Sequence, residues 1–227
     1  MKKRYFIAGT DTDVGKTHIT EALLRAAQQH GFTTLGLKPL AAGADLVDGL
    51  WSNDDARRLQ AVSSLKLPYE QVNPVLLHAA LAPHLAADME QRRLTVQRLA
   101  GYCRGTLMTQ QAQLTLIEGA GGWRVPLNNR ETLADLVIEL NLDVILVVGM
   151  RLGCLNHALL TIEAIERDGL TLAGWVANCI DPQMDSLDAN IHSLISRISA
   201  PLLGTMPFLA EGASAPTDWL DTHFFDG

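Results

Sequence analysis

Hydrophobic and polar residues follow two different spacings along this chain. Apolar runs of strand length alternate with segments in which apolar residues recur at helical spacing, such as Ile19, Ala22, Leu23 and Ala26. The pattern predicts strands at residues 5–8, 33–37, 114–117, 143–148, 172–177 and 202–206, and helices at 16–30, 53–62, 95–111, 132–140, 155–165 and 185–198. Continuous apolar strands that alternate with helices are typical of a parallel sheet covered on both faces. We therefore expect an α/β fold with a mostly parallel central sheet and helices on both faces.

The chain shows no internal repeat, low-complexity tract or linker, and its length suits one domain spanning residues 1–227. Residues 69–83 are expected to form a proline-containing connection. Apolar residues make up 48% and charged residues 19%, which is the balance of a folded globular protein rather than of a disordered chain.

Charge and cysteine content narrow the functional classes. The net charge of −7, with acids scattered along the chain, argues against nucleic acid and anionic lipid as partners. Cys103, Cys154 and Cys179 lie far apart, which indicates neither a zinc site nor a disulfide framework and fits a reducing cytoplasm. The apolar run before Gly9 is too short for a signal sequence or a membrane span.

The segment GTDTDVGKT at residues 9–17 follows the first strand and opens the first helix, the context that a phosphate-binding loop requires. Backbone N–H groups at the helix start would hold phosphate oxygens. Gly15 would allow close approach, Lys16 would reach the β- and γ-phosphates, and the Thr17 hydroxyl would bind Mg²⁺. Five residues separate Gly9 from Gly15, so Thr10 occupies the usual place of the first glycine. The sequence thus predicts a single-domain P-loop NTPase-like fold.

Three charged residues are candidates for chemistry next to this loop. Lys38 ends the second strand, at the edge of the sheet where ligands bind in open α/β folds, and could neutralise an anionic intermediate. Glu118 ends an apolar strand, and a buried acid there needs a cation such as Mg²⁺ beside it. Asp55 is a second metal candidate, in a segment where Asn53 or Asp54 could equally be the helix cap.

Taken together, GTDTDVGKT (9–17), KP (38–39), NDDA (53–56), EGAGGW (118–123) and GWVAN (174–178) closely resemble the dethiobiotin synthetase family. The stretch VILVVGMRLGCLNHALLT (144–161) shares this likeness, and the longer loop is the family's own form. The resemblance implies a homodimeric, ATP- and Mg²⁺-dependent ligase of biotin biosynthesis. It would convert 7,8-diaminopelargonate and CO₂ (or bicarbonate) into dethiobiotin through a carbamate and a carbamic-phosphate intermediate.

The resemblance also implies roles for individual residues. Lys38, Lys16 and Thr12 would act in catalysis, and Thr17, Asp55 and Glu118 would hold Mg²⁺. Nucleotide contacts would come from Asp13, Val14, Gly15, Lys16, Thr17, His18, Asp55, Glu118, Asn178, Pro207, Phe208 and Leu209. The diamine and its carbamate would meet Thr12, Lys38, Ala42 and Gly121, and the partner subunit would hold the substrate carboxylate at Gly153, Cys154, Leu155 and Asn156.

Two positions depart from the family pattern. Ala42 stands where the family often carries a serine that hydrogen-bonds the substrate. Near the carboxyl end, Ser214 replaces an acid that contacts ATP, with Glu211 close by. A diverged second synthetase with a shifted substrate preference is therefore one alternative.

Two further alternatives share this type of P-loop. A cobalamin-pathway synthetase usually carries an added glutaminase domain, for which 227 residues leave no room. A switch ATPase of the partitioning or division-site type carries an extra lysine soon after the first glycine, where this chain has Thr10, Asp11 and Thr12. Such proteins also tend to have basic surfaces or a membrane-binding helix at the carboxyl end, which the acidic sequence does not suggest.

Overall fold

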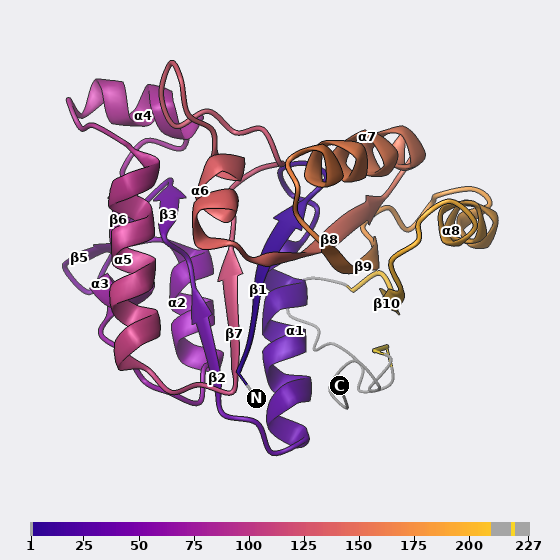
Figure 1. Cartoon of the computed structure of the whole chain (residues 1–227), viewed down its shortest axis with the longest axis horizontal. Helices are drawn as coiled ribbons and strands as arrows, with labels where there is room; N and C mark the ends of the chain where they lie inside the picture. The colour runs from indigo at the N-terminus through magenta and orange to yellow at the C-terminus, as the bar shows by residue number, and fades with distance from the viewer. Residues whose placement is uncertain (1, 210–218, 221–227) are drawn as a thin grey trace.

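A computed structural model describes residues 2–209 and 219–220 and contains a central sheet of six strands (Figure 1). Their order across the sheet is β10-β9-β8-β1-β7-β2, and each neighbouring pair is parallel. The strands are β1 (Lys3–Gly9), β2 (Thr34–Leu37), β7 (Leu114–Glu118), β8 (Asp143–Met150), β9 (Leu172–Cys179) and β10 (Leu202–Met206). The six expected strands are confirmed, and so is the predicted α/β class with its parallel sheet.

Helices cover both faces of the sheet, as expected. Side chains along a strand point alternately to opposite faces, and in this sheet apolar side chains on both faces are buried. In β8, Val144, Leu146 and Val148 pack into one buried cluster, whereas Ile145 and Val147 pack into another. The first cluster includes residues of α5 (Val96–Thr109), α6 (Leu133–Leu140), α7 (Cys154–Arg167) and α8 (Leu187–Ile195), and the second includes residues of α1 (Lys16–Gln29) and α2 (Asp54–Val62). In the described part of the chain, none of the helices has the length and hydropathy needed to cross a membrane.

Between β2 and α5 the chain forms a lobe of short elements that the apolar pattern did not predict. They are β3 (Leu40–Ala42), β4 (Asp45–Val47), β5 (Leu50–Ser52), α3 (Tyr69–Val72), β6 (Val75–Leu77) and α4 (Pro83–Met89). The expectation of a plain connection at residues 69–83 was wrong, because α3, β6 and the start of α4 lie there. These elements are too short to show a period, and β6 is stabilised by parallel pairing with the distant β3. Figure 1 shows the lobe on the side of the sheet where β2 is the edge strand.

Candidate active site

The loop between β1 and α1 is shaped by glycines that a larger residue could not replace without strain. Gly15 begins α1 with a φ of 83°, a left-handed conformation that favours glycine. A Cβ atom at Gly9 would lie 2.7 Å from Cγ2 of Val14, which is too close for a normal contact. Because Gly15 has no side chain to cap the helix, the first N–H groups of α1 remain available to phosphate oxygens.

Asn178, at the end of β9, holds this loop from the side. Its Nδ2 donates to the Val14 carbonyl at 2.8 Å, and the amide lies so close to Gly15 that a Cβ would collide with it. Val14 itself is buried in the core. Asn178 therefore contacts the phosphate loop directly, at the position where the resemblance places a nucleotide contact.

Asp11 organises the other side of the loop. One carboxylate oxygen accepts the Thr12 N–H at 2.8 Å, and the other pairs with Arg151, which follows β8. The Asp11 carbonyl accepts a hydrogen bond of 3.1 Å from Nζ of Lys16. Burial is the main cause that lowers the pKa of Lys16 to about 8, and the nearby Lys38 ammonium lowers it further. A phosphate group would supply the negative charge that this buried lysine lacks.

Lys38 lies at the centre of a buried cluster of charges. Its Nζ donates to Asp55 at 2.8 Å, to Glu118 at 2.6 Å and to the Gly119 carbonyl at 3.1 Å. Burial lowers the pKa of Lys38, but the attraction of Glu118 and Asp55 outweighs burial and raises it overall. Burial alone would raise the pKa of Asp55, but the attraction and the hydrogen bond of Lys38 outweigh burial and lower this pKa overall. Lys38 is therefore a cation at neutral pH, suited to stabilising negative charge rather than to accepting a proton.

The residues expected to hold Mg²⁺ do lie together. The Thr17 hydroxyl donates to Oε1 of Glu118 at 2.7 Å, and Asp55 faces the same cluster. Oε2 of Glu118 is buried, and the described residues give it no hydrogen-bond partner. An unpaired buried carboxylate oxygen is costly, and Mg²⁺ binds such oxygens together with water and phosphate ligands. The set of Thr17, Asp55 and Glu118 therefore fits Mg²⁺, although the described residues contain no cluster of three acids, histidines or cysteines.

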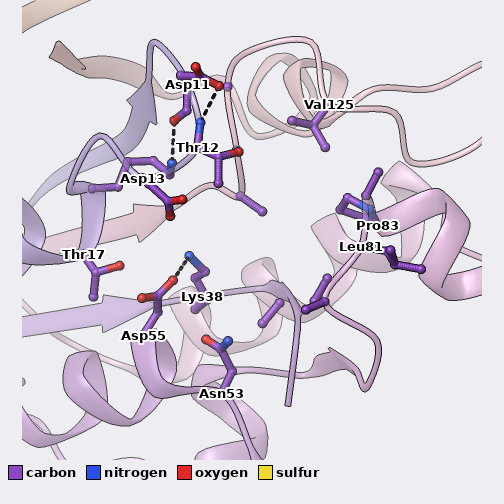
Figure 2. Close-up of a pocket in the computed structure, with 18 of the residues that line it drawn as sticks. Asp11, Thr12, Asp13, Thr17, Lys38, Asn53, Asp55, Leu81, Pro83 and Val125 are labelled. Atoms are coloured by element: carbon purple, nitrogen blue, oxygen red, sulfur yellow. Dashed lines mark hydrogen bonds and ion pairs between the residues drawn. The ribbon is translucent and has the colours of Figure 1, made fainter. Parts of the chain in front are cut away.

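A cavity of about 900 Å³ opens above this cluster (Figure 2). Figure 2 shows Thr12, Lys38 and Asp55 on one side of it and Leu81, Pro83 and Val125 across from them. One side is thus charged and the other apolar. A cavity with this division suits a ligand that has a reactive polar end and an aliphatic chain.

The cavity wall includes many of the residues that the sequence singled out. They are Thr12, Asp13, Gly15, Lys16, Thr17, His18, Lys38, Ala42, Asp55 and Gly121. Glu118 is fully buried beneath the wall, where it contacts Lys38 and Thr17. Asn53, rather than Asp54, is the cap of α2, because its side chain accepts the Ala56 N–H at 3.3 Å. This leaves Asp55 to pair with Lys38.

Other expected site residues lie outside the wall of this cavity. Gly153, Cys154, Leu155 and Asn156 form the start of α7, where Gly153 has a φ of 94° and Cys154 is buried in the core. Pro207, Phe208 and Leu209 follow β10, and Phe208 is half-exposed. Glu211 and Ser214 lie outside the described residues.

The wall also includes residues that the sequence did not single out. Asn53, Arg58, Arg124 and the segment 80–83 contribute to it. Arg124 is fixed by two hydrogen bonds to Asp168, of 2.7 and 2.8 Å, and Asp168 also accepts the Trp123 indole N–H at 2.9 Å. These contacts join the EGAGGW segment to the end of α7, 45 residues further along the chain. Their sequence separation left no local signal by which they could have been found.

Comparisons with known proteins show what this chain is similar to. A family model described as an AAA domain matches residues 3–215. The ATP-dependent dethiobiotin synthetase BioD of Cellvibrio japonicus is 58% identical over 221 residues and covers 96% of both chains. The protein of the same name from Marinobacter nauticus is 49% identical and covers 92% of this chain and 89% of its own.

Solved structures show a more distant likeness. The septum site-determining protein MinD of Pyrococcus horikoshii, complexed with Mg-ADP, has a TM-score of 0.54 at 17% identity. That match covers 91% of this chain and 82% of the MinD chain. The cell division ATPase MinD of Pyrococcus furiosus gives a TM-score of 0.55 at 18% identity, covering 91% and 84%. At this level of identity the likeness shows the P-loop fold alone.

Proposed function

Because the chain belongs to the ATP-dependent dethiobiotin synthetase family, we propose that its cavity closes the cyclic urea of dethiobiotin on 7,8-diaminopelargonate. Carbon dioxide supplies the carbon, and ATP is converted to ADP and phosphate. The observation that carries the proposal is Lys38, buried between Asp55 and Glu118 beside the phosphate-binding loop and facing a partly apolar cavity. A switch ATPase would not need this combination.

On the nucleotide side, the start of α1 and its preceding loop bind the phosphates. The N–H groups from Asp13 to Thr17 donate to phosphate oxygens, and Lys16 places its charge at the transferring phosphoryl group. Thr17, Asp55 and Glu118 would hold Mg²⁺, which would neutralise the negative charge of the phosphates. Asn178, with residues 207–209 beyond β10, is proposed to contact the base.

On the substrate side, Lys38 is the principal catalytic group. One amine of the substrate adds to CO₂ and loses a proton, which gives a carbamate whose negative charge the Lys38 ammonium stabilises. Lys38 and Lys16 together neutralise the charge that develops as a carbamate oxygen takes up the phosphoryl group. Thr12 and the Gly121 backbone then hold the reacting end while the second amine attacks the carbonyl carbon, the C–O bond to phosphate breaks, and phosphate leaves with the proton that the amine gives up.

The far end of the substrate carries a carboxylate, which we propose is bound by a second copy of this chain. Gly153, Cys154, Leu155 and Asn156 begin α7 but lie outside the cavity wall of their own chain. A helix start is suited to an anion. A homodimer in which α7 of one subunit reaches the cavity of the other would use these residues. The three buried free thiols suit the cytoplasm as the place of action.

The reaction can be tested directly with the purified protein. With MgATP, bicarbonate and 7,8-diaminopelargonate, we expect ADP and a product with the mass of the cyclic urea. Omitting either the diamine or bicarbonate should abolish product and lower ADP formation to background. Equal ATP turnover with and without the diamine would instead indicate a switch ATPase.

A further inference from the structure

Lys38 is held at its backbone as well as at its ammonium group. Its N–H donates to the Val72 carbonyl at 2.9 Å, and its carbonyl accepts from Nδ2 of Asn73 at 2.6 Å. Both partners belong to α3 and the residue that follows it. The unpredicted lobe therefore fixes the main chain of the lysine on which the proposed chemistry depends.

The same segment also fixes the start of α2. The Tyr69 hydroxyl donates to Oδ1 of Asn73 at 2.9 Å and accepts the main-chain N–H of Asn53 at 2.7 Å. Asn53 caps α2, and Asp55, two residues further on, pairs with the Lys38 ammonium (Figure 2). These contacts form a closed ring that leaves Lys38 through its side chain and returns to it through its carbonyl.

We propose that Tyr69 and Asn73 are positioning residues, which set the place of the Lys38 ammonium relative to Asp55 in the ring-closing reaction. This inference rests on the proposed function. Neither residue belongs to the cavity wall of the described chain, so each acts through Lys38 and Asn53 rather than on the substrate. Their spacing of four residues across the single turn of α3 places both side chains on one face.

The ring is buried at Lys38 and Asn73, so a polar group that loses its hydrogen-bond partner there is costly. Asn73 is 3% exposed, and its carboxamide is used on both sides, by the Tyr69 hydroxyl and by the Lys38 carbonyl. Burial raises the pKa of Tyr69, so its hydroxyl keeps its proton at neutral pH and can donate and accept at once. Removing that hydroxyl would leave the Asn53 N–H and Oδ1 of Asn73 without this partner, a loss that a small movement of Lys38 or α2 would relieve. A shift of this size matters because the reacting groups must stay aligned.

Tyr69→Phe is the primary test, because it keeps the aromatic side chain and removes only the hydroxyl that takes part in the hydrogen-bonded ring. The matched control is Tyr102→Phe, since the Tyr102 hydroxyl also accepts one hydrogen bond, from Nε of Arg98 at 3.2 Å, but lies on the exposed side of α5. We expect Tyr69→Phe to lower kcat for cyclic-urea formation about tenfold, equivalent to ~1.4 kcal/mol. The KM for ATP and the Kd for ADP should change less than about twofold, and Tyr102→Phe should match the wild type.

A purely structural role predicts something else: a lower melting temperature with an unchanged kcat for the folded protein. That result would overturn the inference. An inactive wild type would instead overturn the proposed function, so the two failures can be told apart.

Asn73→Ala extends the test to the rest of the ring. Because this variant already cuts the ring, adding Tyr69→Phe should lower kcat by less than about twofold more. If Tyr69→Phe lowers kcat by the same factor in the Asn73→Ala variant as in the wild type, the two residues do not act through one shared ring. If Asn73→Ala does not fold, the comparison of Tyr69→Phe with Tyr102→Phe still decides.

Discussion

The two sides of the cavity are built in different ways. The side that we propose for the phosphates comes from one continuous stretch, residues 9–18, in which glycines and the backbone at a helix start would provide the binding groups. The side that we propose for the substrate collects Ala42, Asn53 and residues 80–83, 120–122 and 124–126 from separate parts of the chain. Continuous backbone sites can be recognised in a sequence, whereas a wall assembled from distant segments becomes visible only in the folded structure.

The two sides also differ in what keeps them in place. The phosphate-binding loop depends first on backbone conformations that glycine adopts, at Gly15 above all, and only then on the side chains of Asn178 and Arg151. The substrate side depends on long-range side-chain contacts, such as those of Asp168 with Trp123 and Arg124 and of Asn53 with the Gly43 carbonyl. Lys38 lies between the two sides and connects them. Substitutions on one side should therefore spare the function of the other.

The largest difference between the effect on catalysis and the effect on nucleotide binding is expected for Lys38→Ala. The substitution removes the cation that would stabilise the carbamate and the transferring phosphoryl group, so kcat should fall about 10²- to 10³-fold. The phosphate-binding loop remains intact, and the Kd for ADP should change only a few-fold. Steady-state assays and equilibrium nucleotide binding measure the two effects. The control is Lys66→Ala, which removes an exposed lysine that bonds the Ala61 carbonyl. Equal activity of both variants would exclude Lys38 from the mechanism.

Gly15→Ala should distort the backbone of the phosphate-binding loop and so weaken nucleotide binding. Alanine at a φ of 83° is strained by about 1–2 kcal/mol, and its Cβ would collide with Asn178. The loop must therefore move, and we expect ADP affinity to fall on the order of 100-fold.

Gly31→Ala separates these two causes. Gly31 has nearly the same φ, 82°, but open space around the place of a Cβ. It should lose stability by a similar 1–2 kcal/mol of strain while keeping normal ADP affinity. Isothermal titration and thermal unfolding of both variants provide the comparison. Equal losses of affinity would show that a general loss of stability, rather than the contact of Gly15 with Asn178, lowers ADP binding.

The same division explains how much the sequence could predict. The six strands and their parallel arrangement followed from continuous apolar runs, since a fully buried strand such as β8 needs apolar residues on both faces. Lys16 and Thr17 were readable from a local motif. Placing Lys38 beside Glu118 required only that the carboxyl ends of the neighbouring strands β2 and β7 meet at one edge of the sheet. Asp55 lies in the first turn of α2, and its place in the site was expected mainly from the family resemblance.

What the sequence did not reveal depends on tertiary contacts. β3 and β6 have three residues each and exist because they pair with one another, so neither shows a period of its own. Tyr69 and Asn73 have no motif, and their part in holding Lys38 arises from hydrogen bonds across more than thirty residues. The aliphatic wall of residues 80–83 likewise faces the cavity because of where α4 begins.

A smaller effect should appear in the pH dependence of nucleotide binding. In the free protein the pKa of Lys16 is lowered to about 8, so Lys16 is charged below this pH and loses its charge above it. Phosphate favours the charged form, and binding should therefore take up a proton above about pH 8. We expect ADP affinity to be steady up to pH 7 and to fall about tenfold by pH 9. Lys16→Arg should abolish the slope, because a guanidinium stays charged. A flat wild-type profile would show that the charge on Lys16 contributes little.

Ala42→Ser should have the smallest effect, and it acts on the substrate side alone. Ala42 lines the cavity, so a serine hydroxyl there could reach the substrate, and one added hydrogen bond of about 0.5–1.5 kcal/mol would lower the KM for the diamine about two- to tenfold. Nucleotide affinity should stay the same. Ala80→Ser is the control, since it adds a hydroxyl elsewhere on the same wall. If Ala42→Ser raises the KM for 7,8-diaminopelargonate, the alanine belongs to a site shaped for a different diamine, and the chain is a diverged synthetase.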